Sequence, residues 1–77
     1  MIKALTDLNP GESGIVKGLS GDLPLQSRLV EMGILPGTPI RMVKKSPFHG
    51  PLALKVRNYY ISVRLVEAQS IQVEVSE

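Results

Sequence analysis

The sequence consists of short stretches in which apolar and polar residues alternate, and turns rich in glycine, proline or asparagine separate these stretches. A period of two is typical of β-strands that turn one side to a core and the other to solvent. We expect five strands, over residues 14–19, around residues 40–42, and over residues 52–57, 59–64 and 71–76. The pattern therefore predicts a mainly β chain.

Three of the five strands have a clear apolar face. The residues predicted to face the core are Leu52, Leu54 and Val56 in the third strand, Tyr59, Ile61 and Val63 in the fourth, and Ile71, Val73 and Val75 in the fifth. In the first strand the inward face stays open, because Ile15 and Leu19 compete with Val16. Asn58 tolerates a positive φ, so we expect it to make the tight turn between the third and fourth strands.

One segment has a helical period instead. Leu25, Leu29 and Met32 are spaced so that they share one face of a helix, which predicts a helix over residues 23–32 between the first two strands. Pro24 suits its first turn, and Gly33 follows it where a left-handed residue ends many helices. A short helical turn over residues 66–69 is expected before the last strand.

Five strands and one helix in 77 residues predict a small, partly open β-barrel, because curling hides the edges of a sheet. We expect residues 1–77 to form a single domain, since so short a chain has no room for a second core. The chain has no cysteine, which favours a reducing compartment. Neither a secretory signal nor an apolar run near the ~20 residues of a membrane span is present. We predict a cytoplasmic protein.

Charge is unevenly distributed along the chain. Residues 32–66 hold six basic residues and no acidic one, whereas the rest holds three basic residues and all seven acidic ones. The basic residues expected to point outward from neighbouring strands are Arg41, Lys55, Arg57 and Arg64. Such a face attracts an acidic partner surface or anionic lipid headgroups, more weakly as salt rises. A solvated sheet face without a partner explains the same pattern equally well.

The chain offers little for catalysis. It has one histidine, His49, no cysteine, and no Gly-x-x-x-x-Gly-Lys-Ser/Thr loop for phosphates. General acid–base chemistry requires groups that converge within hydrogen-bond reach, and Glu74 is expected to point outward from the last strand. The sequence therefore predicts a protein that is not an enzyme.

The hypothesis of metal binding depends on His49, the one histidine of the chain. A transition-metal site needs several His or carboxylate ligands, but no acidic residue lies within seventeen positions of His49. We favour an exposed loop histidine over a ligand, and no required cofactor. A site shared with another subunit stays open. The isolated acidic residues are expected to be ordinary surface charges: Asp7, Glu12, Asp22, Glu31 and Glu67.

Aromatic residues are scarce, because the chain has only Phe48, Tyr59 and Tyr60. We expect Tyr59 to be buried, which leaves too few rings for base stacking or for an aromatic groove that binds proline-rich peptides. If a groove exists, aliphatic residues near the helix and the 47–51 loop should form it. Phe48 either anchors a partner there or folds back over the end of the barrel.

A further set of residues resembles a known family by its order and spacing. The set runs Leu5-x-x-Leu8-x-x-Gly11, Arg28-Leu29-x-x-Met32-Gly33-x-x-Pro36-Gly37, Gly50-Pro51, Ile61-x-Val63-Arg64, Glu67-Ala68 and Ile71-x-Val73. This series resembles the FeoA family of ferrous-iron transport accessory proteins, and is similar to the C-terminal SH3-like domain of iron-dependent repressors. The chain departs from the family at Asn58, which is commonly glycine, and at Met32, which is often leucine.

The resemblance implies an SH3-like β-barrel that docks on FeoB, a membrane ferrous-iron transporter with a cytosolic GTP-binding domain. The protein would then lie at the membrane only through this partner. The family is also described as binding transition metals, which makes ferrous iron a candidate ligand. We place the docking contacts at Arg41, Lys55, Arg57, Arg64 and Phe48. Two other functions stay open. One is a nucleic-acid-binding or repressor-associated regulatory module, which the basic pI of 9.2 favours. The other is a metal carrier. Self-association also stays open.

Overall fold

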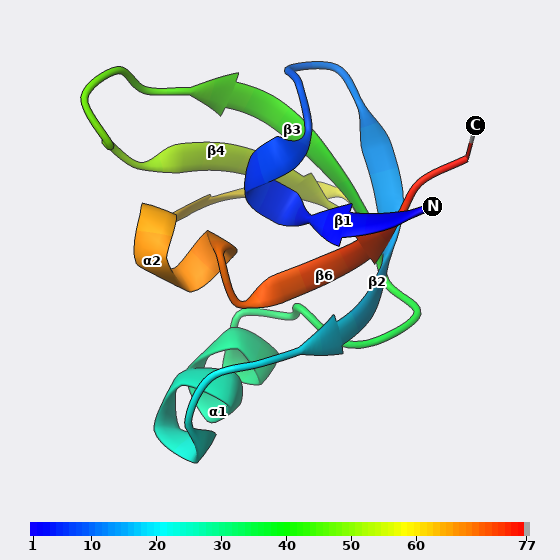
Figure 1. Cartoon of the computed structure of the whole chain (residues 1–77), viewed down its shortest axis with the longest axis vertical. Coiled ribbons are helices and arrows are strands. Elements are labelled where there is room, and N and C mark those ends of the chain that lie inside the picture. The colour runs from blue at the N-terminus through cyan, green and yellow to red at the C-terminus, as the bar shows by residue number, and fades with distance from the viewer. Residues whose placement is uncertain (77) are drawn as a thin grey trace.

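The computed structural model describes residues 1–76 and shows one sheet of six antiparallel strands that curls into a partly open barrel (Figure 1). The strands are β1 (Ile2–Ala4), β2 (Ser13–Leu19), β3 (Pro39–Lys45), β4 (Leu52–Val56), β5 (Tyr59–Val63) and β6 (Ile71–Glu74). They lie side by side in the order β1-β6-β2-β3-β4-β5, so β1 and β5 form the two edges. The helical segments are η1 (Leu5–Asp7), α1 (Leu23–Glu31) and α2 (Leu65–Ala68).

The predicted mainly β, partly open barrel with one short helix is confirmed, and the structure has six strands where about five were expected. β1 has three residues and pairs with β6 through Lys3, which lies opposite Val73. Three residues are too few to show a period of two, so the sequence pattern could not identify this strand. The other five strands and the helix between β2 and β3 are confirmed, and the helical turn predicted over residues 66–69 is α2, one residue earlier.

The core lies inside the curled sheet. The predicted inward residues of β4 and β6 are buried, and so are Leu5, Leu8 and Leu29 beneath them. In β5 the prediction holds for Val63 but is wrong for Tyr59, which is 40% exposed. Tyr59 lies at the turn end of an edge strand, where its hydroxyl donates a hydrogen bond to the main-chain oxygen of Met32 at 3.1 Å.

A β-bulge in β2 settles its inward face. Val16 lies opposite Val73 and Gly18 lies opposite Gln72, so Lys17 is an extra residue without a partner in β6. Val16 is buried, Leu19 is half-buried against the core, and Ile15 is exposed. Because the bulge shifts the alternation by one residue, Val16 and Leu19 both contact the core although three positions separate them.

The ends of α1 follow the expected capping chemistry. The Asp22 side chain accepts a hydrogen bond from the Leu25 amide at 3.0 Å, which satisfies one of the free donors of the first turn. At the other end, Gly33 has a φ of +91° and its amide donates to Val30, while the Ile34 amide donates to Leu29. These two bonds form a Schellman motif, and the buried Ile34 joins the core beside Leu29.

The turn between β4 and β5 differs from the prediction in one respect. Arg57 and Asn58 connect Val56 to its partner Tyr59, and Arg57, rather than Asn58, has the positive φ, +55°. A two-residue hairpin loop requires positive φ at its first central position in either of its favoured turn types.

The helices within residues 1–76 are too short and not apolar enough to cross a membrane.

Candidate functional site

The structure brings together three of the predicted basic residues. Arg41 and Lys55 are direct cross-strand partners on β3 and β4, and Arg57 follows β4 in the hairpin turn. All three line one small hollow of about 210 Å³, together with Ser13, Pro39 and Ile40. We call Arg41, Lys55 and Arg57 the basic triad.

The basic triad brings three positive charges together around one hollow. Ion pairs within residues 1–76 involve the N-terminal amine, Lys3 and Arg28, and none involves the triad. The Lys55 ammonium instead lies 5.8 Å from the centre of the Tyr60 ring, a cation–π arrangement. Arg41 and Arg57 are exposed and Lys55 is half-buried, and a basic cluster of this kind suits contact with carboxylates on a partner.

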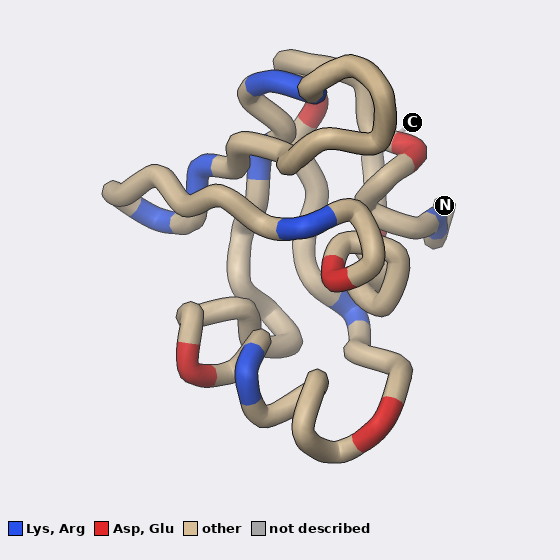
Figure 2. The backbone as a smooth tube through the Cα atoms, turned by 90° about the vertical axis from the view of Figure 1, so that its left-hand side faces the viewer, with Lys and Arg blue, Asp and Glu red and all other residues tan. Residues whose placement is uncertain are grey.

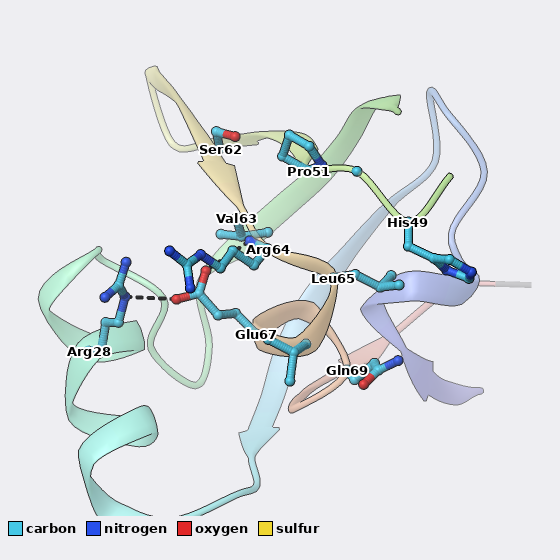
Figure 3. A pocket seen from close by; sticks show the side chains of 11 residues that line it. Arg28, His49, Pro51, Ser62, Val63, Arg64, Leu65, Glu67 and Gln69 are labelled. Atoms are coloured by element: carbon cyan, nitrogen blue, oxygen red, sulfur yellow. Dashed lines mark hydrogen bonds and ion pairs between the residues drawn. The ribbon is translucent and has the colours of Figure 1, made fainter. Parts of the chain in front are cut away.

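Arg64, the fourth predicted residue, lies apart from the triad. It lines a second, larger hollow of about 690 Å³ between the end of β5, α2, the 49–51 loop and Arg28 of α1. Figure 3 shows this hollow, with Pro51, Val63 and Leu65 among its apolar lining. The expectation was that any groove would be formed by aliphatic residues near the 23–32 helix and the 47–51 loop. The loop does contribute, but α1 contributes only Arg28, and most of the lining comes from the end of β5 and from α2. We call this hollow the α2 groove.

The prediction that Glu67 is an ordinary surface charge was wrong. Glu67 is only 5% exposed, and one carboxylate oxygen accepts a hydrogen bond from the Arg64 amide at 2.8 Å. The other oxygen lies 2.7 Å from Nε of Arg28. A buried carboxylate needs such partners, since its burial without them is costly. The signal in the sequence was the spacing of Glu67 three positions after Arg64, as in a capping box, but arginine is not a usual member of that motif.

Phe48 is the most exposed large apolar residue of the described chain, at 97%. Of the two alternatives, the folded-back position is therefore wrong. Phe48 and His49 both have positive φ, +56° and +61°, at the tip of the loop between β3 and β4. This conformation is energetically unfavourable for non-glycine residues, and such strain is often found at functional sites. The loop holds Phe48 out next to His49, which lines the α2 groove.

The histidine does not belong to a recognisable metal site. Within residues 1–76, no three His, Cys, Asp or Glu side chains come close enough together to hold an ion. His49 shares the α2 groove with Glu67, whose two oxygens already accept from Arg64 and Arg28. The residues described therefore do not fit a metal centre.

The fold and these surfaces define a class of protein, a small β-barrel domain with a basic surface and a lined groove. The FeoA domain model matches residues 3–75, nearly the whole chain. The chain belongs to the FeoA family, and it has the SH3-like fold.

Three similar proteins illustrate the range of this family and fold. The chain is 28% identical over 71 residues to an Fe(2+) transport protein A/Fe(2+) transporter FeoB fusion protein of Porphyromonas gingivalis, matching 92% of this chain and 8% of that one. It is 28% identical to Stenotrophomonas maltophilia FeoA complexed with zinc, an SH3 domain protein, with a TM-score of 0.79 over 94% and 89% of the two chains. The chain also resembles a manganese-dependent transcriptional repressor complexed with manganese, with a TM-score of 0.90 and 19% identity. The match covers 97% of this chain and 37% of the repressor chain, and at this identity it shows a shared fold.

The chain thus spans less than a tenth of the fusion protein it matches. The similarity to the repressor confirms the expected relation to repressor SH3-like domains at the level of fold.

Proposed function

We propose that this protein is a non-enzymatic accessory of ferrous-iron transport that docks on the cytoplasmic GTP-binding domain of a FeoB-type transporter. The observation that carries this proposal is the P. gingivalis relative, in which an FeoA part and an FeoB part are fused in one chain. A fusion keeps two domains at high effective concentration, which is useful when they work in contact. Ferrous iron is the cargo of the transporter in this proposal.

The docking surface that we propose is the basic triad, with Phe48 and Arg64 as further contacts. Support for the triad comes from its cross-strand pairing, its shared hollow and its lack of acidic partners. Phe48 and Arg64 lie toward the other end of the β3–β4 hairpin, so a partner that contacts all five residues must cover one flank of the barrel. Figure 2 shows how the basic positions are spread over the chain.

Docking regulates a transporter only if the protein binds two states of that transporter with different affinity. We propose that its preference between states of the GTP-binding domain regulates iron uptake. The zinc complex of the S. maltophilia relative raises metal carriage as another role. The donor groups described for this chain do not support that role.

The test compares two variants with the same change in net charge. Arg41→Glu with Arg57→Glu reverses two members of the triad, and Lys17→Glu with Lys44→Glu reverses two exposed lysines outside it. We expect the first pair to weaken binding to the purified FeoB GTP-binding domain of the same organism by about tenfold or more, because close charge pairs across an interface contribute ~1.5 kcal/mol or more.

Isothermal titration calorimetry at two salt concentrations measures this effect, and circular dichroism confirms that both variants fold. The control pair should bind within about twofold of the parent protein, since rim charges outside the contact act weakly. Equal losses in both pairs, or no loss in either, would show that the triad is not the docking surface.

A further inference from the structure

β5 leaves one edge of the sheet free. It is the last strand in the sheet order, and its residues are two tyrosines, isoleucine, serine and valine, without a charge or a proline. Proteins usually protect an exposed edge with charges, prolines or bulges, because unpaired main-chain groups attract another strand. The opposite edge strand, β1, has only three residues and includes Lys3. β5 thus lacks the common forms of protection.

The register identifies the free main-chain groups. Val56 and Tyr59 close a two-residue hairpin loop, which makes them a hydrogen-bonded pair, and such pairs alternate with non-bonded pairs along antiparallel strands. Lys55–Tyr60 and Ala53–Ser62 are therefore the non-bonded pairs, so the amide and carbonyl groups of Tyr60 and Ser62 point away from β4. Both residues are exposed, and neither forms a main-chain hydrogen bond outside the sheet.

The free edge leads into the α2 groove. Ser62 and Val63 line the groove at the end of β5, and Arg64 continues its wall. In Figure 3 the side chains of Arg28 and Arg64 both extend toward the Glu67 carboxylate. Arg28 pairs with that carboxylate, and Arg64 has no ion pair within residues 1–76. Arg28 is thus paired with the one nearby carboxylate and Arg64 is not, which leaves a net positive charge at the wall of an apolar groove.

We infer that the free edge of β5 and the α2 groove together bind an extended acidic segment of a partner protein, which adds to the sheet as a further strand. The main-chain groups of Tyr60 and Ser62 hold the backbone of this segment. An acidic side chain of the segment lies against Arg64 and the free nitrogens of Arg28, and an aliphatic side chain of the segment enters the groove over Val63 and Leu65. This site shares Arg64 with the docking surface proposed above but lies apart from the basic triad, and it stands whether or not the triad contacts a transporter.

The charge distribution favours this occupant over a second copy of the chain. Residues 32–66, which include β4 and β5, contain six basic residues and no acidic one. Two copies joined through β5 would bring two such segments together, and the repulsion between like charges opposes that contact. An acidic segment meets complementary charge at the same edge.

The experiment titrates the isotope-labelled protein with an acetylated, amidated hexapeptide in which valine and glutamate alternate. We expect the amide signals of Tyr60, Ser62 and Arg64 to shift in NMR spectra, and hydrogen exchange at Tyr60 and Ser62 to slow. A matching peptide with glutamine in place of glutamate should bind about fivefold more weakly, as expected for an exposed charge contact. A peptide with alternate N-methylated amides should not bind, because it cannot pair as a strand.

The variant Arg64→Gln should remove the preference for glutamate over glutamine, and Lys17→Gln should keep it. Arg64→Gln leaves the fold intact, since the contact to Glu67 uses the main-chain amide of residue 64. The inference is overturned if no signal shifts at millimolar peptide, if the N-methylated peptide binds as well as the parent peptide, or if the shifts centre on the basic triad. It is also overturned if Tyr60 and Ser62 are already protected in a dimer of the protein alone, which sedimentation would detect.

Discussion

Gly33 is the residue at which backbone conformation and side-chain contact coincide. Its φ of +91° belongs to the left-handed region, and a Cβ built there would overlap the hydroxyl oxygen of Tyr59. Because that hydroxyl is bonded to the main chain of Met32, the end of α1 and the start of β5 meet at this glycine. Gly37 has a similar φ, +89°, but open space around its own Cβ position.

We therefore predict that Gly33→Ala destabilises the protein more than Gly37→Ala does. In both variants the left-handed conformation of the new alanine lowers the free energy of unfolding by about 1–2 kcal/mol. Gly33→Ala additionally displaces the Tyr59 hydroxyl from its hydrogen bond, at a cost of about 1 kcal/mol. Urea unfolding measures the difference, which should vanish when Gly33→Ala is made in a Tyr59→Phe background. Equal losses for the two alanine variants in the parent protein would show that the Tyr59 contact contributes nothing.

Several of the predictions made for single residues were wrong. Alternation predicted a buried Tyr59, but a residue at the turn end of an edge strand has less to cover it than a residue in a central strand. Residue preference placed the positive φ at Asn58, and the geometry of the two-residue loop places it at Arg57. Glu67 was predicted to be a surface charge, because its partner Arg28 is far away in the sequence and the pairing leaves no local pattern.

At the scale of elements, one ion pair joins α1 to α2. Nε of Arg28 lies 2.7 Å from Glu67, whose side chain is 7% exposed, whereas the Arg28 side chain is 62% exposed. The same carboxylate binds the Arg64 amide at the start of α2. α1 projects from the barrel in Figure 1, and besides the apolar contacts of Leu29, Leu25 and Met32, this pair ties it to the rest of the molecule.

A double-mutant cycle of Arg28→Ala and Glu67→Gln should give a coupling free energy of about 1–2 kcal/mol. This range lies between exposed pairs, at ~0.2–1 kcal/mol, and fully buried ones, because only one partner is buried. Chemical unfolding of the four proteins measures it. The Lys3–Glu12 pair, at 3.8 Å and partly exposed at both ends, is the control, and its coupling should be smaller. A coupling near zero for Arg28 and Glu67 would mean that this ion pair does not help to hold α1 against the barrel.

Elements with strong local signals were predictable from the sequence, and those that depend on pairing were not. α1 was predicted because Pro24, the apolar spacing and Gly33 agree on one helix. β1 was missed because its three residues form a strand only through their pairing with β6. The bulge at Lys17 explains why β2 alone had two competing inward faces.

For the whole molecule, the sequence predicted a curled, mainly β sheet, because the alternation of apolar and polar residues is a pattern of continuous segments. The position of the groove was not predicted, because its lining comes mainly from β5 and α2. How the basic residues divide between two surfaces was not predictable. Arg41 and Lys55 meet by strand register, whereas Arg64 reaches the α2 groove because β5 ends beside α2. Long-range placement of this kind depends on strand register and on how the sheet curls.

The measurement that tests the central claim most directly is an affinity pull-down of the tagged protein from nuclease-treated, detergent-solubilised cells, read by mass spectrometry. An accessory of ferrous-iron transport should retain a polytopic membrane GTPase of the FeoB type at moderate salt, and the Arg41→Glu, Arg57→Glu variant should retain much less of it. Loss of every partner after nuclease treatment, with nucleic acid in the untreated eluate, would contradict the claim and favour a nucleic-acid-binding module.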